Sequence, residues 1–168
     1  MYTSSFSSTN QYAPLSQGQS PVIALNKTFQ ALSTDDKLGL LWIVYTNMGG
    51  SITPAAPGAA RTQFIEGLLE QVKGLTFDEQ YRFMCDLVER RNSDMTRAYG
   101  VFSNNNKLAF WYKLAVLMDA GEVVPVPSGY KLSRDANIVF NQIAGLEFNQ
   151  QITFLRQSVI DMGFDPFA

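Results

Sequence analysis

The sequence predicts an all-α protein with about eight helices. Apolar residues recur at spacings of three and four along most of the 168-residue chain, which is the periodicity of amphipathic helices. Ser, Thr, Pro and Gly fall at the ends of these periodic segments, where helices begin and stop. The chain offers no convincing pair of strands joined by a hairpin turn, so a sheet is not expected.

The chain divides into a short arm and one folded domain. Residues 1–20 are rich in Ser, Thr, Gln and Asn and offer little to bury, so we expect a flexible arm there. The helical periodicity covers residues 21–168, which we expect to form the domain. The expected helices cover residues 21–32, 34–48, 58–73, 77–89, 94–102, 107–120, 134–144 and 148–162.

Several helix starts are marked by residues that satisfy free backbone N–H groups. Pro21 suits the first turn of the first helix, because it has no N–H to satisfy. Ser33 with Asp36 forms a capping-box pattern before the second helix, and Thr76 with Glu79 repeats it before the fourth. In the third and fourth helices the residues expected to face inward are Phe64, Leu68, Leu69, Val72, Met84, Leu87 and Val88.

The helix ends are marked just as clearly. Gly49, Gly74 and Gly121 each follow a periodic segment and predict that the helix stops there. Residues 104–106 are three asparagines, which predict a turn before the sixth helix. Residues 123–132 read VVPVPSGYKL, and their alternating valines and prolines predict an extended connector before the last two helices.

Two aromatic clusters are the strongest indication of function. Residues 38–45 read LGLLWIVY, residues 108–114 read LAFWYKL, and together they hold both tryptophans of the chain. Phe110, Trp111 and Tyr112 are consecutive, so about 100° of helical turn separates each ring from the next. One neighbouring helix cannot cover all three rings, so part of this surface must face a ligand or a partner. Core packing is the simpler interpretation for any one of these rings.

Composition narrows the classes of function. The chain has no histidine, which removes the usual general base and the commonest metal ligand. Its net charge is −2 with no basic stripe, so nucleic acid is not an expected partner. No run of apolar residues is long enough to span a membrane, and the start does not read as a secretory signal. The single cysteine, Cys85, fits a reducing cytoplasm. We therefore expect a binding protein and not an enzyme.

Weaker features each allow two interpretations. Ala55–Ala60 indicates either close helix packing or clearance for a flat ligand. Met84 and Met118 suit either the filling of a core or a polarisable wall around a conjugated ligand. Arg156 is either a solvated arginine or a group near the apolar face. The acidic pair at residues 35–36 fits the first turn of a helix, where the dipole favours negative charge.

Four stretches in a fixed order resemble the N-terminal domain of the cyanobacterial orange carotenoid protein family. They are DDKLGLLWIVYTNMGGSITPAAPGAA, FMCDLVER, KLAFWYKLAVLMDAGEVVPVPSGYKLS and GLEFNQQITFLRQSVIDMGF. The similarity extends over residues 22–164, nearly all of the expected domain. The full-length family continues into a linker and a C-terminal domain of mixed α/β type. This chain stops at Ala168, so we expect a separate gene product that looks like a helical carotenoid protein.

The resemblance implies a fold, a ligand and a location. The fold is two interleaved four-helix bundles with a ligand tunnel between them. The ligand is a keto-carotenoid such as canthaxanthin or echinenone, bound without a covalent bond. The implied role is photoprotection in the cyanobacterial cytoplasm, by dissipating energy from the phycobilisome antenna on the thylakoid or by quenching singlet oxygen. The donors that hold the keto oxygen in full-length relatives belong to the C-terminal domain, so no photoswitch of its own is expected.

The resemblance also implies a set of binding residues. Trp42, Tyr45 and Trp111 would hold one terminal ring of the carotenoid. The family commonly has methionine where this chain has Thr62 and isoleucine where it has Pro54, and both departures bear on which carotenoid fits. The whole implied set is Leu38, Leu41, Trp42, Tyr45, Gly58, Thr62, Met84, Leu108, Trp111, Tyr112, Met118, Val126, Tyr130, Ile152, Thr153 and Arg156.

Partners are implied at a second surface. In the relatives, the arginine that matches Arg156 pairs with the C-terminal domain in the dark form and contacts the phycobilisome in the active form. Arg156 and Asn105 are therefore candidates for binding the phycobilisome or a separate C-terminal-domain homologue. Exposed ring ends also make a homodimer an alternative. The alternative function is a helical adaptor or carotenoid carrier that docks on the antenna or on that homologue.

Overall fold

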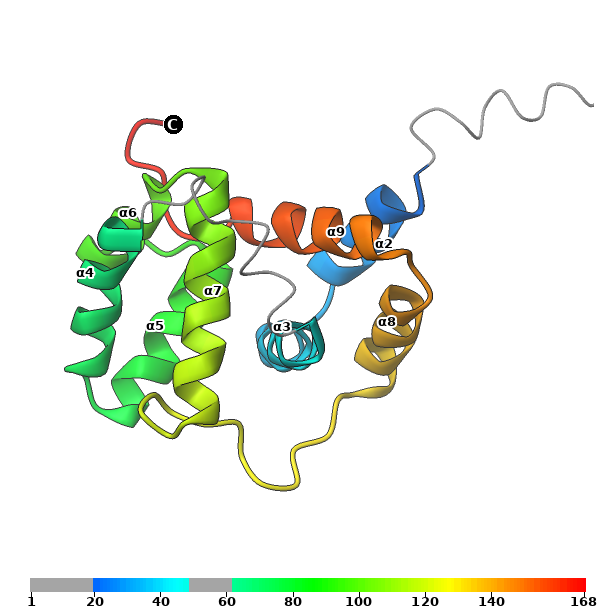
Figure 1. Ribbon diagram of the computed structural model, residues 1–168, viewed down its shortest axis with the longest axis horizontal. Helices are drawn as coiled ribbons and strands as arrows, with labels where there is room; N and C mark the ends of the chain where they lie inside the picture. The colour runs from blue at the N-terminus through cyan, green and yellow to red at the C-terminus, as the bar shows by residue number, and fades with distance from the viewer. Residues whose placement is uncertain (1–19, 49–61) are drawn as a thin grey trace, which may run out of the picture.

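The chain is all-helical wherever its structure is described. The computed structural model describes residues 20–48 and 62–168, in which there are eight helices and no strands, so the predicted fold class is confirmed (Figure 1). The expected arm, the loop with Pro54 and the Gly58 position lie outside the described residues. The helices are α2 (Pro21–Gln30), α3 (Thr34–Met48), α4 (Thr62–Lys73), α5 (Phe77–Glu89), α6 (Asp94–Gly100), α7 (Asn104–Asp119), α8 (Arg134–Ala144) and α9 (Phe148–Ile160).

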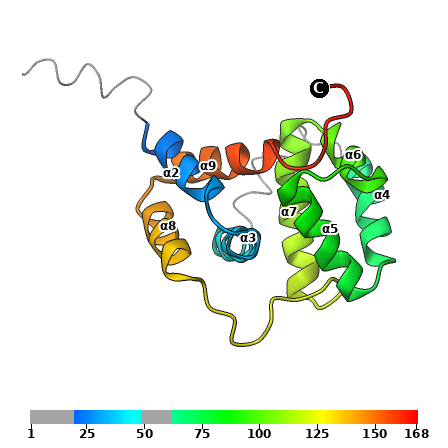
Figure 2. The same ribbon diagram turned by 180° about the vertical axis from the view of Figure 1, so that it is seen from behind.

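The helices form two interleaved bundles of four. The first bundle is α4, α5, α6 and α7, which are consecutive in the sequence. The second bundle is α2, α3, α8 and α9, so it combines the beginning and the end of the described chain. Figures 1 and 2 show α3 end-on between the two groups, and it packs on α5 and α7 on one side and on α8 on the other. The interleaved arrangement that the resemblance implied is confirmed.

The capping boxes have different outcomes. Thr76 and Glu79 form the expected one, because each backbone N–H donates to the other residue's side chain, at 2.9 and 3.2 Å. The bond from the Thr76 backbone holds the pKa of Glu79 below its usual range. At the start of α3 the Asp36 N–H donates to Ser33 Oγ, but the Asp36 carboxylate accepts from Ser133 Oγ at 2.5 Å instead. Ser133 in turn caps α8, so this acid connects two helices of the second bundle.

Two further details of the sequence prediction are wrong. The asparagines at residues 104–106 are the first turn of α7 and not a turn before it, because Ser103 Oγ accepts from the Asn106 N–H at 3.1 Å. Asparagine is tolerated there since the first N–H groups of a helix have no helical partner. Phe64 is 55% exposed, whereas Ile65 is fully buried. The inward stripe of α4 is Ile65, Leu68, Leu69 and Val72, with helical spacings of three and four.

The C-terminal turn of α9 connects the second bundle to the first. The last carbonyl groups of a helix lack helical partners and need donors from elsewhere. The Tyr99 hydroxyl, from α6, donates to the Val159 carbonyl at 2.6 Å. The Lys107 ammonium, from α7, donates to the Ile160 carbonyl at 2.8 Å. Both donors are buried, so α9 ends against the first bundle with these carbonyl groups satisfied.

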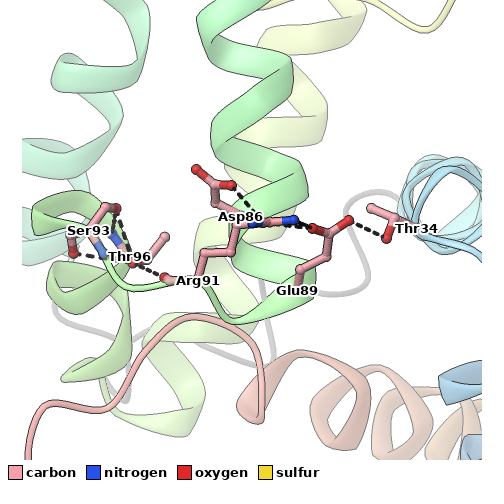
Figure 3. Close-up of polar contacts among 6 residues, drawn as sticks. All are labelled: Thr34, Asp86, Glu89, Arg91, Ser93 and Thr96. Carbon is pink, nitrogen blue, oxygen red and sulfur yellow. Dashed lines mark hydrogen bonds and ion pairs between the residues drawn. The ribbon is translucent and has the colours of Figure 1, made fainter.

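A polar junction joins α3 to the loop between α5 and α6. Thr34 Oγ1 donates to Glu89 Oε2 at 2.8 Å, and the Arg91 guanidinium pairs with Glu89 at 2.8 Å and with Asp86 at 3.5 Å (Figure 3). The Thr34 bond, and then Arg91, hold the pKa of Glu89 below its usual range. The Arg91 carbonyl accepts from Thr96 Oγ1 at 2.6 Å, at the start of α6. The junction therefore fixes where α3 crosses the end of α5.

None of the helices in residues 20–48 and 62–168 combines the length and the apolar character that crossing a bilayer requires.

The C-terminal segment docks where α6 ends, and Gly100 makes room for it. The Phe164 N–H donates to the Thr96 carbonyl at 3.1 Å, and the Gly163 N–H donates to the Leu87 carbonyl at 2.8 Å. A Cβ atom on Gly100 would lie 2.0 Å from the Phe164 carbonyl oxygen. Because the clashing atom belongs to the backbone, the segment itself would have to move.

We expect Gly100→Ala to destabilise the protein by about 1–3 kcal/mol, as overpacking does. The free energy of unfolding in urea measures the effect. Gly67→Ala is the matched control, since a Cβ there has no heavy atom within 4 Å. It should stabilise α4 by about 0.5–1 kcal/mol, because alanine is the better helix former. Equal stabilities for the two variants would contradict this packing.

Candidate ligand-binding cavity

An apolar cavity of about 360 Å³ lies where α3 faces the first bundle. Such a volume is at the lower end of the range for small-molecule sites. It is bordered by α3, α5, α7 and the connector of residues 123–132. Its described lining is Asp35, Leu38, Gly39, Leu41, Trp42, Tyr45, Phe77, Asp78, Tyr81, Met84, Trp111, Ala115, Met118, Val124, Pro125, Val126, Pro127 and Tyr130.

The helices α3, α5 and α7 each contribute one stripe of residues to the cavity wall, and the residues of a stripe are spaced so that they share one face of the helix. Residues three, four or seven apart lie on one face of a helix, so they line a cavity together. From α3 the stripe is Leu38, Leu41, Trp42 and Tyr45; from α5 it is Phe77, Tyr81 and Met84; and from α7 it is Trp111, Ala115 and Met118. The wall is therefore built mainly of aromatic rings, aliphatic chains and methionine thioethers.

The connector closes the cavity and is held by a buried glutamine. The Val124 N–H donates to Gln80 Oε1 at 2.7 Å. The Gln80 amide nitrogen donates to the carbonyl groups of Val72 and Leu75, at 3.0 and 3.2 Å. Gln80 is only 1% exposed, so these three hydrogen bonds are made inside the protein. Proline at positions 125 and 127 has no N–H to satisfy, which allows this extended segment to line an apolar space.

Two of the aromatic wall residues have their polar atoms bound to the protein. The Tyr45 hydroxyl donates to the Leu108 carbonyl at 3.1 Å, and the Trp111 indole N–H donates to the Tyr99 hydroxyl at 3.0 Å. Burial raises the pKa of Tyr45 and of Tyr99 well above the usual value, so both phenols are neutral. These bonds orient the rings and leave apolar faces toward the cavity.

Trp42 differs from the other two. Its ring lines the cavity, but its indole N–H is buried without a hydrogen-bond partner in the described part of the chain. A buried donor without a partner costs about 1–3 kcal/mol. Trp42 is therefore the wall residue whose polar atom could gain most from a ligand.

The rim of the cavity carries its carboxylates. The Tyr81 hydroxyl donates to the Asp35 carboxylate, and the Tyr130 hydroxyl donates to the Asp35 carbonyl at 3.2 Å. The bond to Asp35, followed by one to Cys85, raises the pKa of Tyr81 well above its usual value. Burial raises the pKa of the Cys85 thiol, which therefore stays protonated at neutral pH.

A second, smaller hollow lies between α3 and α7. It has a volume of about 200 Å³ and is bordered by Tyr45, Thr46, Tyr112, Ala115, Val116 and Asp119. Tyr45 and Ala115 line both spaces, so they form the partition between them.

The predicted binding residues fall into three groups. Those that line the cavity are Leu38, Leu41, Trp42, Tyr45, Met84, Trp111, Met118, Val126 and Tyr130. Those that lie elsewhere are Leu108 and Ile152, both buried, Tyr112 in the second hollow, Thr153, which is exposed, and Arg156, which donates to Asn105 Oδ1 at 3.1 Å. Gly58 and the side chain of Thr62 are outside the described residues.

Sequence reasoning missed part of the α5 wall and the close approach at Gly39. Phe77 and Tyr81 lie seven and three residues before Met84, so their helical spacing from Met84 could have indicated them. Gly39 lines the cavity because a Cβ there would lie 2.6 Å from Cε2 of Tyr130. No signal in the sequence pairs these two residues, which are 91 positions apart by number (130 − 39).

Comparisons with known proteins agree with this geometry. The family model described as orange carotenoid protein, N-terminal, matches residues 16–165. An orange carotenoid-binding domain-containing protein of Nostoc sp. is 57% identical over 140 residues, which cover 83% of this chain and 82% of the relative. The solved red carotenoid protein of Anabaena (Nostoc) sp. binding canthaxanthin is 36% identical with a TM-score of 0.77, covering 86% of this chain and 99% of the other.

A longer relative is matched over part of its length. The orange carotenoid protein of Anabaena (Nostoc) sp. binding canthaxanthin is 48% identical with a TM-score of 0.79. The match covers 86% of this chain and 47% of that structure, so the chain spans about half of this relative.

The close approach of Tyr130 to Gly39 allows a test of the cavity wall. We expect Gly39→Ala to displace the Tyr130 ring and break its hydrogen bond to Asp35. Losing one such bond, worth about 1 kcal/mol, should speed amide hydrogen exchange in the connector roughly five-fold. Mass spectrometry of residues 123–132 measures this rate. Gly67→Ala should leave it unchanged, and an unchanged rate in Gly39→Ala would show that Tyr130 does not hold the connector.

Proposed function

Because this chain belongs to the orange carotenoid protein N-terminal family, we propose that it binds a keto-carotenoid non-covalently in the cavity between α3, α5 and α7, for photoprotection. The observation that carries the proposal is the wall of three apolar stripes, in which the polar atoms of Tyr45 and Trp111 are bonded back into the protein. The bound pigment itself supplies the photochemistry, by releasing excitation as heat or quenching singlet oxygen. The protein supplies solubility, shape and position.

Burial of apolar surface provides enough free energy for such a complex. A forty-carbon polyene that loses several hundred Å² of exposed surface gains on the order of 10 kcal/mol before the cost of association. Ring stacking adds about 1 kcal/mol for each aromatic pair. Tight binding therefore needs no charged residue in the wall, and the carboxylates at Asp35 and Asp78 remain at the rim.

We propose that different residues of the wall contact different parts of the ligand. Trp42, Tyr45 and Trp111 hold one terminal ring by offset or edge contacts. Leu38, Leu41, Met84, Met118, Val126 and Tyr130 surround the adjoining polyene. For the remaining family positions, Gly58, Thr62, Leu108, Tyr112, Ile152, Thr153 and Arg156, we propose places along the polyene beyond the Tyr45 partition.

We further propose that Arg156 and Asn105 form the partner-binding surface. They lie on different bundles, on α9 and α7, and their side chains are hydrogen-bonded at 3.1 Å. A partner carboxylate could compete with the Asn105 oxygen for the guanidinium, since charged acceptors bind arginine more strongly. The phycobilisome, a C-terminal-domain homologue or a second copy of this chain in the cyanobacterial cytoplasm are the candidate partners. An adaptor or carotenoid-carrier role is the alternative that this surface favours.

The first experiment is the visible absorption spectrum of the protein purified from cells that make canthaxanthin. We expect a carotenoid band that co-elutes with the protein and is shifted to the red of the free pigment, because the wall planarises and polarises the polyene. Quenching of phycobilisome fluorescence by the coloured protein then separates an antenna quencher from a carrier. A colourless, folded, helical protein would reject the binding proposal and favour the adaptor.

A mutation of the wall tests the placement of the ring. We expect Trp111→Ala to lose pigment on size-exclusion chromatography and to lower stability by roughly 3 kcal/mol or more, because it opens a cavity and removes a stacking face. Ile138→Ala, at an exposed position of α8, is the control and should keep both pigment and stability. Pigment retained at the wild-type level by the Trp111 variant would place the ring elsewhere.

A further inference from the structure

The three aromatic residues that surround the proposed ring position are not equivalent. The polar atoms of Tyr45 and Trp111 are bonded to the Leu108 carbonyl and the Tyr99 hydroxyl. The indole N–H of Trp42 is buried and has no acceptor among the residues described. If only an apolar surface were needed at this position, phenylalanine would supply it without a donor that must be satisfied.

The cavity wall has little to offer this donor. Leu38 and Leu41, in its own stripe, have no side-chain acceptor. Neither the Tyr45 hydroxyl, which donates to the Leu108 carbonyl, nor the Asp35 carboxylate, which accepts from Tyr81, accepts a hydrogen bond from the indole N–H. An acceptor brought in by a ligand is therefore the partner that best fits the free N–H.

The Trp42 ring can present its N–H to such a ligand. The N–H is covered, but the rigid indole that carries it forms part of the cavity wall. The second side-chain torsion of tryptophan has a broad energy minimum, so a modest rotation is easily reached. Rotation toward the cavity would exchange an unpaired donor for a paired one.

We propose that the Trp42 indole N–H donates a hydrogen bond to an oxygen on the terminal ring of the ligand, and so selects oxygenated carotenoids over hydrocarbon ones. This inference rests on the proposed carotenoid-binding function. A keto oxygen is a good acceptor, whereas a hydrocarbon ring leaves the donor unpaired. One such bond corresponds to a preference of roughly ten-fold.

Competition between two pigments tests the selection. Canthaxanthin and β-carotene share one carbon skeleton and differ in the ring keto groups. The apoprotein is offered an equimolar mixture, and the extracted bound pigments are quantified by chromatography. We expect wild type to prefer canthaxanthin and Trp42→Phe to lose roughly ten-fold of that preference. Trp111→Phe is the matched control, because its N–H is already used by Tyr99, and it should weaken both pigments alike.

A second measurement needs no variant. The chain has two tryptophans, so a ¹⁵N-labelled sample gives two indole N–H resonances. On titration with canthaxanthin, we expect the Trp42 resonance to move downfield, and β-carotene should not produce that shift. The Trp111 resonance is the internal reference for ring-current effects common to both pigments.

The possible outcomes distinguish a failure of the Trp42 hydrogen bond from a failure of carotenoid binding itself. Uptake of neither pigment would overturn the proposed function and the inference together. Uptake of canthaxanthin with the same preference in wild type and Trp42→Phe, or equal Trp42 shifts with both pigments, would overturn the inference alone. If Trp42→Phe and Trp111→Phe lost the preference for canthaxanthin equally, the selection would depend on the shape of the aromatic rings. That result would also overturn the inference.

Discussion

The buried hydroxyl of Tyr99 is the contact on which the rest of the structure most depends. It accepts a hydrogen bond from Trp111 and donates one to the Val159 carbonyl, so one oxygen joins α6, α7 and α9. The residue is fully buried, and water cannot replace either bond. The same hydroxyl therefore determines where the second bundle meets the first and how the tryptophan ring faces the cavity.

The position of α3 follows from a second constraint, the need to bury an almost uniformly apolar helix. Its buried residues include Leu40 and Val44 as well as Leu41 and Tyr45, so it has no broad face for solvent. A helix apolar on most sides must be surrounded. It packs on α5, α7 and α8, and the cavity lies on the side of α3 that faces α5 and α7. The apolar space thus lies where α3, a helix of the second bundle, meets the first bundle.

Much of this architecture could be predicted from residue patterns. Periodicity located the eight helices of the described residues, and the Thr76 capping box was correct because it depends on neighbouring residues only. The patterns could not supply contacts between distant residues. Asp36 was assigned to its own helix but bonds Ser133, and the proximity of Gly39 to Tyr130 depends on how the connector folds back.

In the candidate site, too, the positions of residues along one helix could be predicted, whereas their contacts with other helices could not. Spacing placed Trp42 and Tyr45 on one face of α3, the family resemblance grouped them with Trp111, and the structure brings all three to one cavity. Their polar atoms were not predictable, since the partners of Tyr45 and Trp111 lie on α7 and α6. The contrast with the unpaired Trp42 could be recognised only after those bonds were known.

The connector has a consequence for how quickly a bound molecule could leave. Its attachments include one hydrogen bond from the Val124 N–H to Gln80 and one from the Tyr130 hydroxyl to the Asp35 carbonyl. Ser133, which follows the connector, donates two hydrogen bonds to the Asp36 carboxylate. Such bonds can open one at a time, without separating the two bundles or exposing the core. The affinity of the cavity comes from its apolar walls, whereas the lifetime of the complex would be governed by this connector. Changes in the hydrogen bonds that attach the connector could therefore adjust the residence time of the ligand while leaving its equilibrium binding nearly unaltered.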